Sequence, residues 1–195
     1  MFGPSLFRTL IFGSGSILSG ITEKIIKLTE LVSVIPQNET INEVLFYGSE
    51  YEEKKKEVGL NNLFCIYYVI IQASFTIDVC VPSLTSDTIS KCLINVQKKN
   101  KVKIRIVVHN ENGNYDCFLQ SDIEVKVIKS KVKMEHEYLL IDASPEQEAI
   151  AVIGSLDYEV ARINSNRDTT IITSEPIVIE TLKKEFDRIW NSSDS

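Results

Sequence analysis

The sequence is poor in the residues on which much acid–base and metal chemistry depends. Among 195 residues there are only two histidines, His109 and His136, which restricts any mechanism that needs imidazole groups. The four cysteines never occur as CxxC, and no histidine stands at a metal-finger spacing from them. Cys65, Cys80 and Cys92 lie in apolar runs, so we expect them to be buried thiols in a reducing compartment.

An excess of positive charge is also missing, since 21 Lys and Arg residues stand against 27 Asp and Glu residues. The formal net charge is -6 and the pI is about 5.1, a balance that gives no electrostatic help in binding nucleic acid or an anionic membrane. Hydrophobic residues make up 44% and charged residues 25% of the chain, which is typical of a globular domain.

A long uninterrupted hydrophobic run is missing as well. Residues 6–21 are apolar but include Arg8, three glycines and three serines, whereas a spanning helix needs about 20 mostly apolar residues. Two interpretations stay open, a weak membrane anchor and an amphipathic leader. We therefore divide the chain into residues 1–41, a leader with a possible anchor and a linker helix, and residues 42–195, a single domain.

Hydrophobic periodicity predicts an alternation of helices and strands. Helices are expected at residues 22–34, 60–75, 86–99, 115–120 and 177–190, and strands at 43–47, 76–81, 102–108, 123–128, 134–142, 149–153 and 169–173. Residues 48–59 are charged and are expected to form a solvated loop. This alternation favours an α/β fold with a mostly parallel central sheet and helices on both faces.

Three segments together resemble the phospholipase D superfamily, in its Zucchini or mitochondrial cardiolipin hydrolase branch. They are EVLFY at 43–47, MEHEYLLID at 134–142 with AVIGSLDY at 151–158, and residues 164–190, which end in Glu185, Phe186, Ile189 and Trp190. The resemblance implies a phospholipase D-like domain over most of the chain from residue 42 onward.

The family motif is His-x-Lys followed after four residues by Asp. In the family the His attacks phosphorus, the Lys neutralises phosphate oxygens, and a second His protonates the leaving group. With Asp142 at the Asp position, Glu135 stands at the His position and Glu137 at the Lys position. Gly154 and Ser155 match the family's Gly-Ser pair. Asp157 replaces an Asn of the family, and Asp168 stands where the family carries an acid that orients the His.

These substitutions predict a degenerate site, with Glu135, Glu137, Asp142, Ser155, Asp157 and Asp168 as its positions and no intact catalytic set. Carboxylates at Glu135, Glu137 and Asp157 would repel a phosphodiester. We expect no cofactor and no metal, although these three carboxylates also suit a hard cation such as Mg²⁺ or Ca²⁺. The family's zinc-binding insertion has no counterpart ligands, because residues 48–59 contain neither Cys nor His.

His136 offers an alternative nucleophile only if the strand slips by one residue. Such a slip would turn every side chain to the other face and would put Tyr138 at the cationic position. We therefore expect His136 to point away from Glu135 and Glu137.

Three functions remain open. The first is a catalytically inactive protein that acts by homodimerisation, by pairing with an active relative or by binding another partner, at the outer mitochondrial membrane or, if the leader does not insert, in the cytoplasm. The second is an active cardiolipin phosphodiesterase or single-strand RNA endonuclease of the piRNA pathway. The third is an unrelated acidic α/β interaction module. Nucleic acid binding is expected to be weak or absent, with two lysine-rich stretches, residues 98–105 and 126–133, as its only support.

Overall fold

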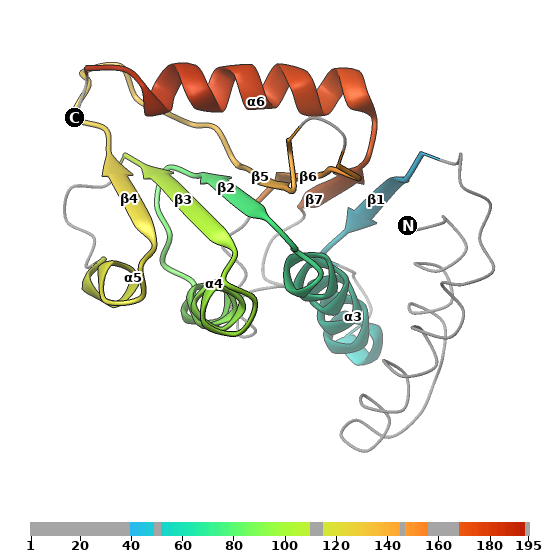
Figure 1. Cartoon of the computed structure of the whole chain (residues 1–195). Coiled ribbons are helices and arrows are strands. Elements are labelled where there is room, and N and C mark those ends of the chain that lie inside the picture. Colours follow the sequence, from blue (N-terminus) through green and yellow to red (C-terminus); the bar gives the residue numbers. More distant parts are fainter. Residues whose placement is uncertain (1–39, 49–51, 110–114, 145–146, 156–167, 194–195) are drawn as a thin grey trace.

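A single mixed sheet organises the chain, with strand order β1-β7-β6-β5-β2-β3-β4 (Figure 1). The computed structural model describes residues 40–48, 52–109, 115–144, 147–155 and 168–193. The strands are β1 (Asn42–Phe46), β2 (Thr76–Cys80), β3 (Lys103–Val108), β4 (Glu124–Val127), β5 (Tyr138–Ile141), β6 (Ile150–Gly154) and β7 (Thr169–Thr173). The helices are α3 (Glu52–Ile71), α4 (Asp87–Asn100), α5 (Asp116–Leu119) and α6 (Pro176–Trp190).

The predicted α/β fold with helices on both faces is confirmed, because α3, α4 and α5 cover one face and α6 covers the other (Figure 1). The sheet is mixed and not mostly parallel. Only β2–β3 and β3–β4 pair in parallel, whereas the other four pairings are antiparallel. A helix returns the chain between β2 and β3, whereas residues 142–149, which join β5 to β6, are too few for the crossover that parallel pairing needs.

Side chains on the sheet face that α3, α4 and α5 cover form the larger core. The register aligns alternate residues of neighbouring strands on this face. These residues are almost entirely buried aliphatics, among them Ile77, Ile104, Ile106, Leu139 and Val152, each 0% exposed. Such uniform burial is typical of central strands covered by helices.

The sheet face under α6 carries both apolar and charged side chains, and the charged ones form an ion network. Asp78 on β2 is opposite Arg105 on β3, and the Arg105 guanidinium donates two hydrogen bonds of 2.8 Å to the Asp78 carboxylate. The same guanidinium lies 3.3 Å from Asp187 on α6 and 4.8 Å above the Phe186 ring. Burial opposes ionisation of Arg105, but hydrogen bonds and charge from Asp78 and Asp187 raise its pKa. The network thus fastens α6 to the centre of the sheet.

Two predicted element boundaries were wrong. Residues 52–59 belong to α3 and not to a solvated loop, because Glu and Lys are strong helix formers and extend the apolar helix by two turns at its N-terminal end. The strand expected from residue 134 begins only at Tyr138, so Glu135 and Glu137 lie in the irregular segment that enters β5. Within the described ranges no helix is both long and apolar enough to cross a bilayer. The leader, residues 6–21, lies outside the described residues, as does most of the predicted first domain.

The predicted burial of three cysteines is largely confirmed, since Cys65 and Cys80 are buried and Cys92 is half-buried. Burial raises the pKa of the Cys65 and Cys80 thiols to about 12 and that of Cys92 to about 11. We expect iodoacetamide at pH 8 to modify the exposed Cys117 rapidly in the native chain and the other three only after unfolding. Peptide mass spectrometry measures this difference, and equal labelling rates in the native chain would contradict the burial.

Removal of Arg105 is expected to destabilise the fold strongly. Arg105→Leu leaves the Asp78 carboxylate, 2% exposed, with Lys183 at 3.7 Å as its one cation among the described residues, and breaking such a buried pair typically costs about 3–5 kcal/mol. Lys103→Leu is the matched control on the same strand and face, because its pair with Glu124 is exposed and is expected to contribute under about 1 kcal/mol. Urea unfolding compares the two variants, and equal losses would refute the network's role.

Candidate functional site

The candidate site lies at the end of the sheet where β5 and β7 begin and β6 ends. The backbone N–H of Gly154 donates to the carbonyl of Glu137 at 2.9 Å, and Gly154 pairs with Thr170 on the other side. Asp168 directly precedes β7, and its carbonyl accepts from Tyr47 N–H at 3.0 Å. The backbone therefore brings Glu137, Ser155 and Asp168 to one end of the sheet. Asp157 lies outside the described residues.

Gly154 is required by the backbone at this point. Its φ is +120°, and an added Cβ would lie 2.3 Å from the Thr169 carbonyl oxygen. No other residue fits so close an approach of two strands. The glycine thereby fixes where Ser155 leaves β6, next to the start of β7.

Glu135 and Glu137 differ in environment. The Glu135 side chain is 66% exposed and forms an ion pair with Lys133, whose hydrogen bond and charge lower the pKa of the Glu135 carboxyl. Glu137 is half-buried, and its carbonyl extends the pairing between β5 and β6. Glu135 is thus an ionised carboxylate next to a lysine, and such a group does not attract a phosphate.

His136 contacts α6. One of its ring nitrogens, Nε2, lies 3.1 Å from Oε1 of Glu185, and the His136 ring centroid is 6.0 Å from that of Tyr138. Glu185 also accepts two hydrogen bonds of 2.7 Å from Arg188. The hydrogen bond from Arg188 lowers the pKa of Glu185 most, and burial opposes it; the charge of Arg188 and the contact with His136 lower this pKa further. His136 therefore takes part in a surface cluster on α6.

Asp142 lies at the opposite end of β5 from Glu137. Four residues lie between the two, and the five steps of extended chain span roughly 16 Å. The Asp142 carboxylate accepts hydrogen bonds from the backbone N–H groups of Ser74, Phe75 and Thr76 at 2.9, 2.7 and 2.8 Å. Asp142 thus fastens the turn between α3 and β2, and the structure does not bring it together with Glu137, Ser155 and Asp168.

Asp168 also makes a local backbone contact. Its Oδ1 accepts from the N–H of Thr169 at 2.7 Å, at the point where β7 begins. The carboxylate therefore helps to start the strand, whatever other contact it makes at this end of the sheet.

One residue of this region was missed in the sequence. Asn62 on α3 is only 3% exposed, and its amide donates to the Phe46 carbonyl at 2.9 Å, where β1 ends. The available signal was a polar residue inside the apolar run of residues 60–75, because a buried amide needs a hydrogen-bond partner.

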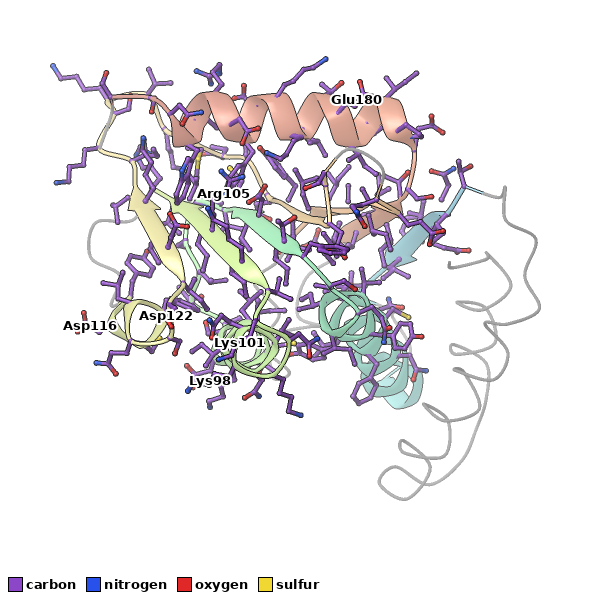
Figure 2. The ribbon with its side chains drawn as sticks, in the orientation of Figure 1. Lys98, Lys101, Arg105, Asp116, Asp122 and Glu180 are labelled. Carbon is purple, nitrogen blue, oxygen red and sulfur yellow. The ribbon has the colours of Figure 1, made fainter. Side chains whose placement is uncertain are left out.

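Two basic residues of the lysine-rich stretches have structural partners within the fold. Arg105 points to α6 and is paired with Asp78. Lys98 and Lys101 lie at the C-terminal end of α4, on the other side of the sheet (Figure 2). Lys126 donates to the carbonyls of Trp190 and Ser192 at 2.8 and 2.5 Å, at the C-terminus of α6. The structural roles of Arg105 and Lys126 further weaken the case for a nucleic acid surface.

A metal centre receives no support from the described ranges, which contain no group of three Asp, Glu, His or Cys side chains arranged to hold an ion. A cation site formed by the carboxylates of Glu135, Glu137 and Asp157 stays a hypothesis, because Asp157 lies outside the described residues.

The structural role of Asp142 gives a direct prediction. Asp142→Asn places an amide donor against three backbone donors, so we expect a loss of about 2–4 kcal/mol in unfolding free energy. Asp168→Asn is the control, because that carboxylate accepts one described backbone hydrogen bond, and its expected loss is about 1 kcal/mol or less. Chemical denaturation measures both, and a smaller loss for Asp142→Asn would contradict the assignment.

The chain is similar to known proteins in both sequence and fold. The family model described as "Cardiolipin synthase, PLD-like domain" matches residues 66–190. A mitochondrial cardiolipin hydrolase of Chlamydomonas reinhardtii is 27% identical over 124 residues, which cover 61% of this chain and 53% of the relative. That of Xenopus tropicalis is 20% identical over 95% of this chain and 93% of the relative. The algal match thus spans only about half of its relative's length.

Solved structures support the same fold. Nuc of Salmonella typhimurium, a phospholipase D family member, has a TM-score of 0.60 at 17% identity and covers 78% of this chain and 95% of that one. NucT of Helicobacter pylori has a TM-score of 0.59 at 16% identity and covers 79% and 98%. At such identities the likeness shows the fold alone, whereas the family model covers more than half of the chain. The chain therefore belongs to the PLD-like family, the family to which the resemblance in its sequence pointed.

Proposed function

We propose that this chain is a PLD-like protein that does not cleave phosphodiesters and that acts by binding another protein subunit. The observation that carries the proposal is the presence of Glu135 and Glu137 where the family motif has its nucleophilic His and its Lys. The proposal rests on the alignment of Asp142 with the motif Asp, and the backbone roles of Asp142 and Gly154 are consistent with that alignment.

Charge is the physical reason for inactivity. Phosphoryl transfer needs cations or donors that stabilise negative charge as it develops on the phosphate oxygens. Carboxylates at Glu135 and Glu137 present the opposite sign, and Lys133 is already paired with Glu135. Neither carboxylate supplies what the motif Lys supplies, even though a carboxylate can act as a nucleophile in other enzymes.

The subunit that we propose as the partner is a second copy or an active relative. In family members with one motif, the site is assembled across a two-fold interface, so a degenerate subunit in a mixed dimer would contribute neither His nor Lys. Such a subunit would lower the activity of its relative.

A second candidate is an active cardiolipin phosphodiesterase or single-strand RNA endonuclease that uses His136. The contact between the half-exposed His136 and Glu185 favours it, because a carboxylate that holds an imidazole is a common feature of catalytic histidines. We rank it second because Tyr138, two residues on, supplies no positive charge. The names of the relatives and the family resemblance suggest the outer mitochondrial membrane and piRNA processing as the setting to test.

An assay of the full chain tests the proposal. We expect no turnover of single-stranded RNA, cardiolipin or a chromogenic phosphodiester by the wild type, with or without added divalent metal. Glu135→His with Glu137→Lys restores the motif residues and is expected to gain turnover. Glu135→Gln with Glu137→Gln is the matched control, because it removes both charges without restoring the motif.

Wild-type turnover that persists through purification would contradict the proposal. If His136→Ala then abolished that turnover, the second candidate would replace the first. Co-expression with an active relative tests the partner separately, and failure to co-purify with either that relative or a second copy would refute the pairing.

A further inference from the structure

The C-terminal half of α3 carries apolar or aromatic side chains on every side. Residues 63–71 of this helix include no charged residue and no amide. Ile66 and Ile70 are 0% exposed and belong to the larger core, whereas Phe64 is 43% and Ile71 40% exposed on the opposite side of the helix. A surface helix normally carries polar residues on its outer side, and a helix that is apolar all round is normally covered.

The exposed residues follow one line along α3. Phe64, the half-buried Tyr67 and Ile71 are spaced at i, i+3 and i+7, which places them on one face of the helix. We call these three residues the outer α3 stripe. This spacing is that of the apolar seam through which two helices pack side by side.

A matching stripe precedes the described residues in the sequence. Residues 22–34, for which hydrophobic periodicity predicts a helix, carry Ile25, Leu28 and Val32 at the same i, i+3 and i+7 spacing. These residues lie outside the described part of the chain, so the match is one of sequence. The segment has no net charge, because it contains two acidic and two basic residues, namely Glu23, Lys24, Lys27 and Glu30.

The point where the described chain begins lies within reach of α3. Ile41 is fixed beside the end of β7, because its N–H donates to Oγ of Ser174 at 2.7 Å and its carbonyl accepts from the Ser174 N–H at 2.9 Å. At the other end of β1, the Asn62 amide of α3 donates to the Phe46 carbonyl at 2.9 Å. The chain from residue 34 to Ile41 spans at most about 25 Å, whereas a strand of the length of β1 spans roughly 17 Å.

Covalent attachment favours residues 22–34 over a separate molecule as the cover of the outer α3 stripe. A short linker gives a tethered segment an effective concentration of roughly millimolar. A contact between two short apolar stripes that is too weak to hold a separate partner at micromolar concentration is therefore formed within one chain.

We propose that residues 22–34 dock as an amphipathic helix on the outer α3 stripe, with the apolar side chains of the two stripes in contact. Figure 1 shows α3 on the opposite side of the sheet from α6. The leader, residues 6–21, would then leave the domain on the α3 side, and an anchor in this leader would hold the domain by that side. The inference goes beyond the proposed function, because it holds whether or not the chain cleaves phosphodiesters.

Hydrogen–deuterium exchange of the full chain tests the docking. In the wild type we expect the amides of residues 22–34 to exchange at least about tenfold more slowly than in Phe64→Gln with Ile71→Gln, because an undocked helix of this length is marginal in water. Glutamine removes the apolar contact and keeps helix propensity. Leu119→Gln with Ile177→Gln is the matched control, since these residues are 59% and 74% exposed at other sites, and its exchange in residues 22–34 is expected to equal that of the wild type.

A second variant tests the same contact from the leader side. If Phe64→Gln with Ile71→Gln fails to fold by circular dichroism, Ile25→Gln with Val32→Gln replaces it and is expected to lose the protection of residues 22–34 in the same way. Protection that survived in this variant would contradict the docking.

Three outcomes would overturn the proposal. The first is exchange of residues 22–34 in the wild type at the rate of an unstructured peptide, and the second is unchanged protection in the folded α3 variant. The third is protection that appears only at high protein concentration or only with vesicles of phosphatidylcholine and phosphatidylserine, since a second copy or a bilayer would then cover the outer α3 stripe. None of these measurements uses turnover or co-purification, so their result is independent of the tests of the proposed function.

Discussion

Alternation along the segment that enters β5 determines where its chemical groups point. Pairing of β5 with β2 and β6 fixes the register, so Tyr138 and Leu140 face α6 while Leu139 and Ile141 face the larger core. His136 continues the first series and contacts Glu185 on α6. A one-residue slip that moved His136 to the side of Glu137 would also exchange two buried cores, and this cost opposes a rescued motif.

The ion network under α6 is the second constraint. Asp78 and Arg105 are nearly buried, and Asp187 and Lys183 from α6 complete the cluster. Because Arg105 also lies over the Phe186 and Trp190 rings, the network fixes both the position and the rotation of α6. A fixed α6 in turn holds Glu185 near His136.

Much of this architecture was predictable from the sequence, because hydrophobic periodicity located β2, α4, β3, β4, β7 and α6 to within a few residues. Strand direction was less predictable, because local periodicity does not determine which strands become neighbours. The role of Arg105 was missed because its partners Asp78 and Asp187 are 27 and 82 residues away. The motif alignment assigned Glu137, Gly154 and Asp168 to one site, and the structure brings them to one end of the sheet, but the alignment could not show that Asp142 lies at the other.

Trapping of a covalent phosphoenzyme tests the central claim of inactivity most directly. Nucleophilic attack by a histidine in this family leaves phosphorus bonded to an imidazole nitrogen, and rapid quenching under alkaline conditions followed by peptide mass spectrometry detects such an adduct. We predict no phosphorus adduct on His136 or His109 of the wild type after incubation with a chromogenic phosphodiester. An adduct on His136 that forms and decays at the rate of turnover would contradict the account.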